Sequence, residues 1–149
     1  MGEEENMNEK SRQEVLKVEM ESLSRNEELA RVMAAVFLAR LDPTVEEIDD
    51  IKTAVSEAVT NAVIHGYQNG DGIIYMEIRI RGKEAEIEIR DQGVGIPDIK
   101  KAMEPMYTTD TTGQRSGMGF SFMEAFMDEL QVESQPGMGT KILMKKKIR

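Results

Sequence analysis

Residues 56–66 read Ser-Glu-Ala-Val-Thr-Asn-Ala-Val-Ile-His-Gly and place polar side chains in an otherwise apolar helical stretch. Glu57, Asn61 and His65 recur at every fourth position, so they stack along one face of the helix. Burial of a carboxylate or a carboxamide is costly unless the group is paired or takes part in chemistry. This polar stripe is therefore the first candidate for an active site, although such pairs are also common on exposed helix faces.

The residue types of the stripe suit a reaction with phosphates. A glutamate on a helix can take a proton from an attacking hydroxyl or water within hydrogen-bond reach. The asparagine carbonyl is a hard oxygen donor suited to Mg²⁺, which keeps several waters and bridges phosphates. Glu57 and Asn61 are four residues apart and point into one region. His65 continues the stripe, and a core or capping histidine is the favoured interpretation for it.

The composition bounds the class of protein. The length of 149 residues predicts one domain over residues 14–149, preceded by a disordered polar segment over residues 1–13. No apolar run approaches the roughly 20 residues that span a bilayer, and the acidic start lacks a signal-peptide core. The absence of cysteine excludes disulfides and fits a reducing compartment. We therefore expect a cytoplasmic protein without a membrane partner.

The net charge of −9 opposes general nucleic-acid binding, which needs a basic surface. The chain nevertheless ends in a basic cluster, residues 145–149. We interpret this cluster as a solvated strand end that is protected from edge pairing.

Upstream of the stripe, the pattern predicts a strand and two helices. Residues 15–20 alternate as in a half-buried strand. Ser24 or Asn26 can cap a helix over about 26–40. The apolar positions expected on one face of that helix are Leu29, Val32, Met33, Val36 and Phe37.

The helix that carries the stripe has clear boundaries in the sequence. Asp42-Pro43-Thr44 breaks the preceding helix, and Thr44 with Glu47 forms a capping box that opens the next one. This helix is expected to run to about His65, with Gly66 as its stop.

Downstream, two alternating runs joined at Gly82-Lys83 predict a β-hairpin, and the loop over residues 104–118 is long enough to be functional. The resulting order implies a two-layer α/β sandwich, with a mixed, mostly antiparallel sheet and its helices on one face. The predicted ranges are strands 73–81 and 84–90, a short helix 98–103, a helix 119–129, and strands 130–134 and 140–147.

Further candidate motifs lie after the hairpin. Asp91, at a strand end, can accept a hydrogen bond from an exocyclic amine such as that of adenine, and Gly93 and Gly95 allow close approach of the backbone to a flat ring. Residues 115–120, Arg-Ser-Gly-Met-Gly-Phe, place backbone N–H groups at a helix start, which suits a polyphosphate. Thr140 comes after Gly139 at the start of the last strand, and its side chain can form a hydrogen bond next to Asp91. Each motif alone is more typical of an ordinary turn or helix start.

Together, the order and spacing of these motifs are restrictive. A Glu-x-x-x-Asn helix, an Asp-x-Gly-x-Gly turn, a long loop, a Gly-x-Gly helix start and a final Gly-Thr resemble the GHKL superfamily of ATP-binding proteins. The resemblance covers residues 15–147 and implies the Bergerat fold, with residues 104–118 as a mobile ATP lid.

Several members of the superfamily can be excluded because they need parts that this chain lacks. Gyrase, Hsp90 and mismatch-repair members need further domains, and histidine kinases need a phosphoacceptor histidine outside the ATP-site helix, whereas the one histidine here is His65. The stretches Ser24–Val32, Leu41–Thr44 and Ser56–Tyr67 look like the anti-sigma factor kinases of sporulation, which bind sigma F, more than their general-stress relatives, which bind sigma B.

This resemblance implies a protein serine kinase that sequesters a sigma factor and phosphorylates the sigma factor's anti-anti-sigma antagonist. It implies Glu57 as the catalytic base, Asn61 as the Mg²⁺ ligand and Asp91 as the selector of adenine in ATP or ADP. The resemblance also implies a homodimer. The remaining residues implied around the nucleotide are Gly93, Gly95, Thr108, Thr109, Arg115, Ser116, Gly117, Gly119 and Thr140.

Several points stay open at this stage. Arg31 matches a position of partner contact in the family, whereas a solvated helix charge is the default for any single arginine. Arg115 suits either a phosphate or a partner. The rival functions are a non-catalytic module whose affinity for partners is set by nucleotide, and an ATPase without a protein substrate.

Overall fold

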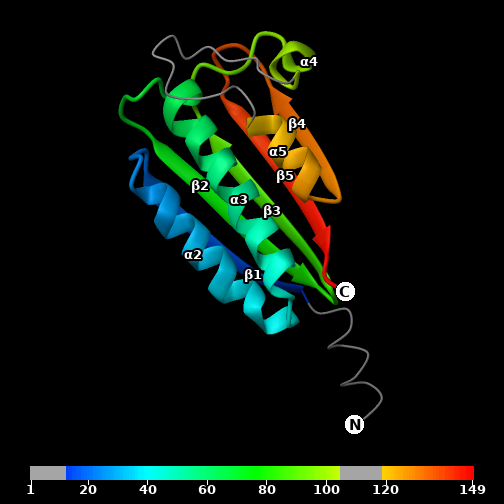
Figure 1. Cartoon of the computed structure of the whole chain (residues 1–149). Helices are drawn as coiled ribbons and strands as arrows, with labels where there is room; N and C mark the ends of the chain where they lie inside the picture. The colour runs from blue at the N-terminus through cyan, green and yellow to red at the C-terminus, as the bar shows by residue number, and fades with distance from the viewer. Residues whose placement is uncertain (1–12, 105–118) are drawn as a thin grey trace.

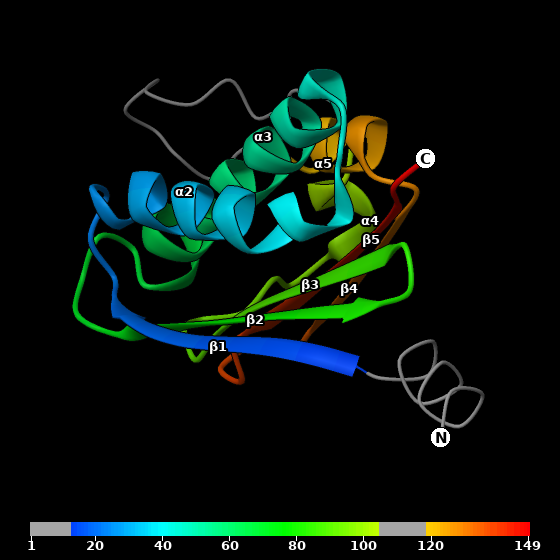
Figure 2. The same ribbon diagram turned by 90° about the horizontal axis from the view of Figure 1, so that it is seen from below.

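The structure is a computed structural model that describes residues 13–104 and 119–149. It has two layers, a five-stranded sheet and a layer of helices that covers one face of it (Figures 1 and 2). The strands are β1 (Gln13–Glu21), β2 (Ile73–Arg81), β3 (Glu84–Asp91), β4 (Glu129–Ser134) and β5 (Thr140–Lys147). The helices are α2 (Asn26–Leu38), α3 (Val45–Asn61), α4 (Ile99–Ala102) and α5 (Gly119–Phe126), with the short turns η1 (Ala39–Leu41) and η2 (Ala62–Gly66).

The strands lie in the order β1-β2-β3-β5-β4, and every pairing between them is antiparallel. The two-layer architecture is as predicted, but the sheet is antiparallel throughout rather than mixed. Figure 1 shows why β1 and β2 are antiparallel: α2 and α3 run side by side in opposite directions and return the chain to the end at which β1 finished. The hairpin predicted at Gly82-Lys83 joins β2 and β3. Gln13, expected in the disordered segment, pairs with Arg81 as the first residue of β1.

Helix α3 begins as the sequence predicts. The backbone N–H of Glu47 donates to Thr44 Oγ1 at 3.1 Å, and the Thr44 N–H donates to Glu47 Oε1 at 2.9 Å, which completes the capping box. The predicted caps of α2 are wrong, because Arg25 occupies the cap position and no side chain caps that helix. Asn26 instead donates its side-chain N–H to the carbonyl of Glu21 at 2.8 Å and ties the helix start to the end of β1.

Helix α2 buries a face other than the expected one. Its buried residues are Ala30, Ala34 and Leu38, whose small or slender side chains let α2 lie close to α3. Met33 and Phe37, from the predicted face, are half-buried against the core. The other residues of that face are exposed, namely Leu29, Val32 and Val36, at 49%, 48% and 68%.

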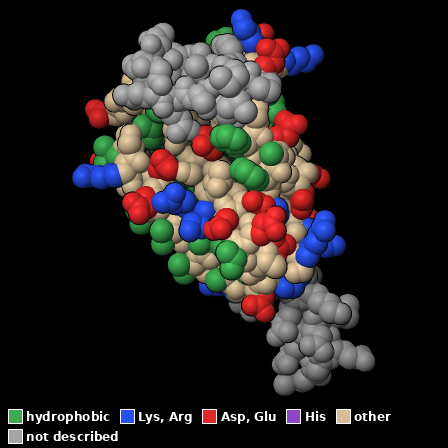
Figure 3. Space-filling view, in the orientation of Figure 1, with side chains coloured by type: hydrophobic (Ala, Val, Ile, Leu, Met, Phe, Trp, Pro, Cys, Tyr) green, Lys and Arg blue, Asp and Glu red, His purple; other side chains and the backbone are tan. Residues whose placement is uncertain are grey.

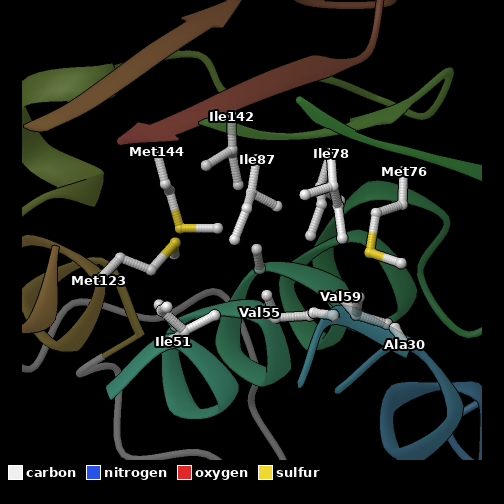
Figure 4. Close-up of a cluster of buried hydrophobic side chains, with 14 of the residues drawn as sticks. Ala30, Ile51, Val55, Val59, Met76, Ile78, Ile87, Met123, Ile142 and Met144 are labelled. Carbon is white, nitrogen blue, oxygen red and sulfur yellow. The ribbon is translucent and has the colours of Figure 1, made fainter. Parts of the chain in front are cut away.

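The core lies between α3 and the middle strands. Figure 4 shows side chains of the sheet pointing toward side chains of the helix layer, with Met123 and Met144 meeting at one side. All of the labelled residues are buried, which accounts for the strict alternation of the strands. The labelled residues are Ala30, Ile51, Val55, Val59, Met76, Ile78, Ile87, Met123, Ile142 and Met144.

The face of the sheet away from the helices carries charged side chains in alternating signs. Arg79 pairs with carboxylates on β2 and β3, and Lys145 bridges Glu86 at 3.4 Å and Glu129 at 3.7 Å. The interpretation of residues 145–149 as a protected edge is therefore wrong. Strand β5 lies between β3 and β4, and its lysines neutralise glutamates of both neighbours.

The end of the chain contributes to the core. Ile148 is 1% exposed, its N–H donates to the carbonyl of Lys83 at 2.8 Å, and the N–H of Arg149 donates to Glu47 Oε2 at 3.0 Å. We expect Ile148→Ala to lower the free energy of unfolding by about 2–4 kcal/mol, because it removes buried methylene groups and leaves a cavity. Urea unfolding followed by circular dichroism measures the change. Val45→Ala, at a side chain 76% exposed, is the control and is expected to change stability by less than about 0.5 kcal/mol.

Candidate functional site

The candidate nucleotide-site residues that the structure describes lie at one end of the molecule. There the end of β3 and the start of β5 lie side by side in the sheet, and the end of α3, the helix α4 and the start of α5 lie above them (Figure 1). Asp91 is the last residue of β3 and is paired in the ladder with Thr140, the first residue of β5. The register of these two strands therefore brings together two residues that lie far apart in the sequence.

Asp91 is a buried carboxylate, 6% exposed, with backbone donors around it. The N–H of Gly93 donates to its Oδ1 at 2.9 Å, and Thr140 supplies a second backbone hydrogen bond. Burial raises the pKa of Asp91 above the usual aspartate value, and the two backbone donors only partly oppose that effect. The site thus holds a carboxylate whose remaining acceptor capacity is available to a ligand donor.

Gly66 lies directly over this carboxylate. A Cβ built on Gly66 would lie 2.8 Å from Asp91 Cγ and from both of its oxygens. The helix reaches this position by widening, since α3 ends at Asn61 and continues as the π-helical turn η2 up to Gly66. The sequence pattern predicts Gly66 only as a helix stop. Its contact with Asp91 was missed, because a sequence does not show which loop faces a helix end.

The loop after Asp91 is held between two other turns. The N–H of Val94 donates to the carbonyl of Gly66 at 2.9 Å, and the N–H of Gly137 donates to the carbonyl of Val94 at 2.7 Å. Gly93 and Gly95 leave no room for a side chain, since a Cβ would lie 2.0 Å from the Gly66 carbonyl oxygen and 2.0 Å from that of Gln135, respectively. The glycines of the motif thus let the loop pack tightly against protein backbone on both sides.

A small hydroxyl network supports the start of β5. Thr140 is 4% exposed, and its Oγ1 lies 2.9 Å from Ser134 Oγ. Ser134 Oγ also accepts from the N–H of Ile96 at 2.7 Å. Ser134 was not predicted from the sequence, since a serine at a strand end carries no specific signal. It joins β4, β5 and the loop after Asp91.

Glu57, Asn61 and His65 are half-buried, so the stripe lies on a partly accessible face of the helix. Glu57 Oε2 lies 3.2 Å from the position that a Cβ of Gly119 would occupy. Gly119 is the first residue of α5, so the carboxylate faces the start of that helix. The structure therefore brings Glu57 next to one glycine of the predicted Gly-x-Gly motif.

Five other residues predicted for the nucleotide site lie outside the ranges that the structure describes. They are Thr108, Thr109, Arg115, Ser116 and Gly117.

The donor set suits Mg²⁺ only in company with a phosphate ligand. Within residues 13–104 and 119–149, no group of three or more histidine, cysteine or acidic side chains could hold a metal ion by itself. Mg²⁺ commonly binds through one or two protein oxygens, phosphate oxygens and waters. The half-buried carboxamide of Asn61, one turn beyond Glu57, fits that mode.

The first two helices are tied together near the stripe. On α2, the carboxylate of Glu27 accepts hydrogen bonds from Ser56 Oγ and, at 3.3 Å, from Thr60 Oγ1. Ser56 and Thr60 directly precede Glu57 and Asn61 on α3. Arg31 lies one turn further along α2, and its Nε is buried without a hydrogen-bond partner in the described part of the chain. A buried donor without an acceptor carries a desolvation cost.

Comparison with known proteins agrees with this geometry. Residues 20–146 match the histidine kinase-like ATPase domain family. The chain is 58% identical to the anti-sigma F factor of Clostridium acetobutylicum over 124 residues, which cover 83% of this chain and 87% of that protein. It is 58% identical to the anti-sigma F factor of Thermoanaerobacter pseudethanolicus over 85% of this chain and 89% of that one, and 53% identical to that of Clostridium kluyveri over 88% and 92%.

Solved structures support the fold. The RsbU and RsbW domains of Rv1364c from Mycobacterium tuberculosis align with a TM-score of 0.65 at 20% identity, over 91% of this chain and 32% of that one. The catalytic domain of the histidine kinase ThkA aligns with a TM-score of 0.56 at 17% identity, over 89% and 96%. Among the described residues, no helix is both long and apolar enough to cross a membrane.

Proposed function

Since this chain belongs to the histidine kinase-like ATPase domain family, we propose that it is an anti-sigma factor with protein serine kinase activity. It binds a sporulation sigma factor, sigma F, and transfers the γ-phosphate of ATP to a serine of the anti-anti-sigma antagonist. The similarity to anti-sigma F factors over most of both chains supports the sigma factor as partner. The observation that carries the kinase is a pair of carboxylates in different surroundings, Asp91 buried and Glu57 half-buried at the start of α5.

In this proposal Asp91 selects the base. Its ionised carboxylate accepts a hydrogen bond from the exocyclic amine of adenine, while Gly93 and Thr140 hold it from the protein side. Asn61 would hold Mg²⁺, which neutralises charge on the phosphates during transfer. The start of α5 at Gly119 offers backbone N–H groups to the phosphates.

Glu57 acts on the incoming serine. Its carboxylate accepts the proton of the serine hydroxyl as the bond between serine Oγ and the γ-phosphorus forms and the bond to the ADP oxygen breaks. Phosphoryl transfer needs little covalent help from the protein, so the task of Glu57 is to orient that hydroxyl and accept its proton. Its place beside Gly119 supports this role, because the phosphates bound at the start of α5 would then lie near it.

The position of Gly66 gives a direct test of the base-binding end. We expect Gly66→Ala to weaken ADP binding about tenfold or more, because the new Cβ would press on Asp91 from 2.8 Å and force the carboxylate to move. Isothermal titration calorimetry measures the affinity. Gly82→Asn is the control: it lies in the hairpin at the other end of β3, where nothing is within 4 Å and asparagine tolerates the positive φ of 60°.

We propose α2 as the surface for protein partners. Leu29, Val32 and Val36 are exposed on one face of α2, whereas Arg31 lies on a different side of that helix, and Figure 3 shows hydrophobic side chains at the surface over α2 among charged ones. An exposed apolar patch among charged side chains suits a protein interface. The homodimer implied by the resemblance remains part of this proposal.

We expect Arg31→Glu to weaken binding of sigma F about 100-fold or more, since it places a carboxylate where the partner offers an acceptor. Surface plasmon resonance with immobilised sigma F measures this effect, and the affinity for ADP should stay unchanged. Arg81→Glu, an exposed change at the end of β2, is the control. Equal sigma F binding by the Arg31 variant and the unaltered protein would remove Arg31 from the partner surface.

A further inference from the structure

Tyr67 connects three segments at the base-binding end of the site. It directly follows η2, and its hydroxyl oxygen accepts a hydrogen bond from the N–H of Gln92 at 2.7 Å. The same hydroxyl donates to the carbonyl of Ile73, the first residue of β2, at 2.6 Å. One phenol group therefore joins the end of the stripe helix, the residue after Asp91 and an inner strand of the sheet.

The ring of Tyr67 has little freedom to move. A Cβ on Gly72 would lie 2.4–2.6 Å from three of its ring carbons, so the ring lies against the backbone of that glycine. The N–H of Tyr67 donates to the carbonyl of Ala62 at 2.8 Å, which closes the wide turn η2. The backbone and the ring of Tyr67 are thus both held in place. Its hydroxyl therefore offers the N–H of Gln92 an acceptor at a fixed position.

Tyr67 forms one link between the end of η2 and the Asp91 loop. A second link is the hydrogen bond from the N–H of Val94 to the carbonyl of Gly66. These two links bind the loop on either side of Gly93, whose own N–H donates to Asp91 Oδ1. Gly93 holds the Asp91 carboxylate, and its two chain neighbours, Gln92 and Val94, are themselves held in place. These contacts therefore fix the direction of the carboxylate.

We propose that Tyr67 is a positioning residue that sets the orientation of Asp91 and so the preference of the site for an adenine base. Tyr67 acts through the backbone of Gln92 and does not itself need to touch the nucleotide. This inference rests on the proposed role of Asp91 as acceptor for the exocyclic amine. Without the hydroxyl, Gln92 loses its acceptor. The loop keeps its hydrogen bonds at Val94 and Ile96 but not the one next to Asp91, so the carboxylate is held less firmly.

The test compares two nucleotides that differ at the position of the exocyclic amine, the group from which Asp91 is proposed to accept a hydrogen bond. ADP carries the exocyclic amine, whereas inosine diphosphate carries a carbonyl oxygen at that position and keeps as a donor on that edge only the neighbouring ring N1–H. The affinities of the full-length protein for both nucleotides, measured by calorimetry with Mg²⁺, give a ratio that depends on Asp91. We expect Tyr67→Phe, which keeps the ring against Gly72, to lower this ratio about fivefold, mostly through weaker ADP binding.

Tyr75→Phe is the matched control. Tyr75 lies on β2 with its ring 4.8 Å from the Arg90 guanidinium, a contact that phenylalanine retains, and it projects from the face of the sheet away from Asp91. The control should keep the ratio of the unaltered protein, and thermal unfolding of all three proteins reports on stability separately.

Each outcome decides between the claims. A Tyr67→Phe protein with the unaltered ratio, whether or not its unfolding temperature falls, would overturn the inference and leave the role of Asp91 standing. An unaltered protein that binds the two diphosphates equally would instead overturn the base-selecting role of Asp91, and the inference with it. A lower ratio for Tyr67→Phe but not for Tyr75→Phe supports the positioning role.

Discussion

Glu57→Gln is expected to reduce serine phosphorylation by about 10²–10⁴-fold while leaving ADP and sigma F binding unchanged. Glutamine keeps the size of the side chain beside Gly119, so the packing of α3 against α5 is retained. It cannot accept the serine proton, and the loss should match the usual contribution of a positioned general base. Transfer of ³²P from ATP, measured as a single-turnover rate with saturating antagonist, gives the effect.

Glu46→Gln is the control for this change. Glu46 lies in the first turn of the same helix and is exposed, so the same loss of charge there should leave the phosphorylation rate unaltered. Because the sigma F complex does not need a base, the Glu57 variant also separates the kinase from a nucleotide-gated binding module. A Glu57→Gln protein that phosphorylates at the full rate would exclude Glu57 as the base.

Asp91→Asn is expected to weaken ADP binding about 100-fold and to leave the protein as stable as before, or more stable, at neutral pH. A carboxamide presents a donor where adenine also presents one, so a charge-assisted hydrogen bond is lost and a donor is left unpaired. Asp71→Asn, in an exposed loop, controls for the loss of one charge. Loss of ADP affinity together with global unfolding of the Asp91 variant would contradict this account.

The stability part of this expectation follows from the sign of the pKa shift. Burial raises the pKa of Asp91, so the folded state binds this proton more tightly than the unfolded state does. The ionised Asp91 therefore costs stability once the pH exceeds the ordinary aspartate value, and acidification through the raised pKa relieves that cost. In urea unfolding between pH 4 and pH 7, the unaltered protein should lose stability relative to the Asp91→Asn variant as the pH rises.

Local patterns predicted most of the secondary structure. The hairpin at Gly82-Lys83, the capping box at Thr44 and the last strand at residues 140–147 lie where alternation, turn residues and capping predict them. These features depend on residues close together in the chain, so a single sequence contains the information. Glu57 became a candidate because a polar side chain in an apolar helix has a cost that calls for a reason, and Asp91 because it begins an Asp-x-Gly-x-Gly turn at a strand end.

Features that depend on tertiary packing could not be predicted in the same way. Helix α2 buries Ala30 and Ala34 and exposes Val32 and Val36, because close approach to α3 favours small residues over the largest apolar area. The sequence predicts Gly66 as the end of a helix. Its contact with Asp91 follows only from the tertiary structure, which brings η2 and the loop after β3 together. Tyr67, Ser134 and the antiparallel order of all strand pairs belong to the same class.

The most direct test of the proposed function is phosphate transfer from ATP to the antagonist. The full-length protein is incubated with γ-³²P-ATP, Mg²⁺ and the purified anti-anti-sigma protein, and the labelled residue is mapped by mass spectrometry. The account predicts label on one serine of the antagonist, dependent on Mg²⁺ and lost in Glu57→Gln. Release of free phosphate without label on the antagonist would contradict it in favour of a simple ATPase, and ADP binding with no turnover at all would contradict it in favour of a nucleotide-gated binding module.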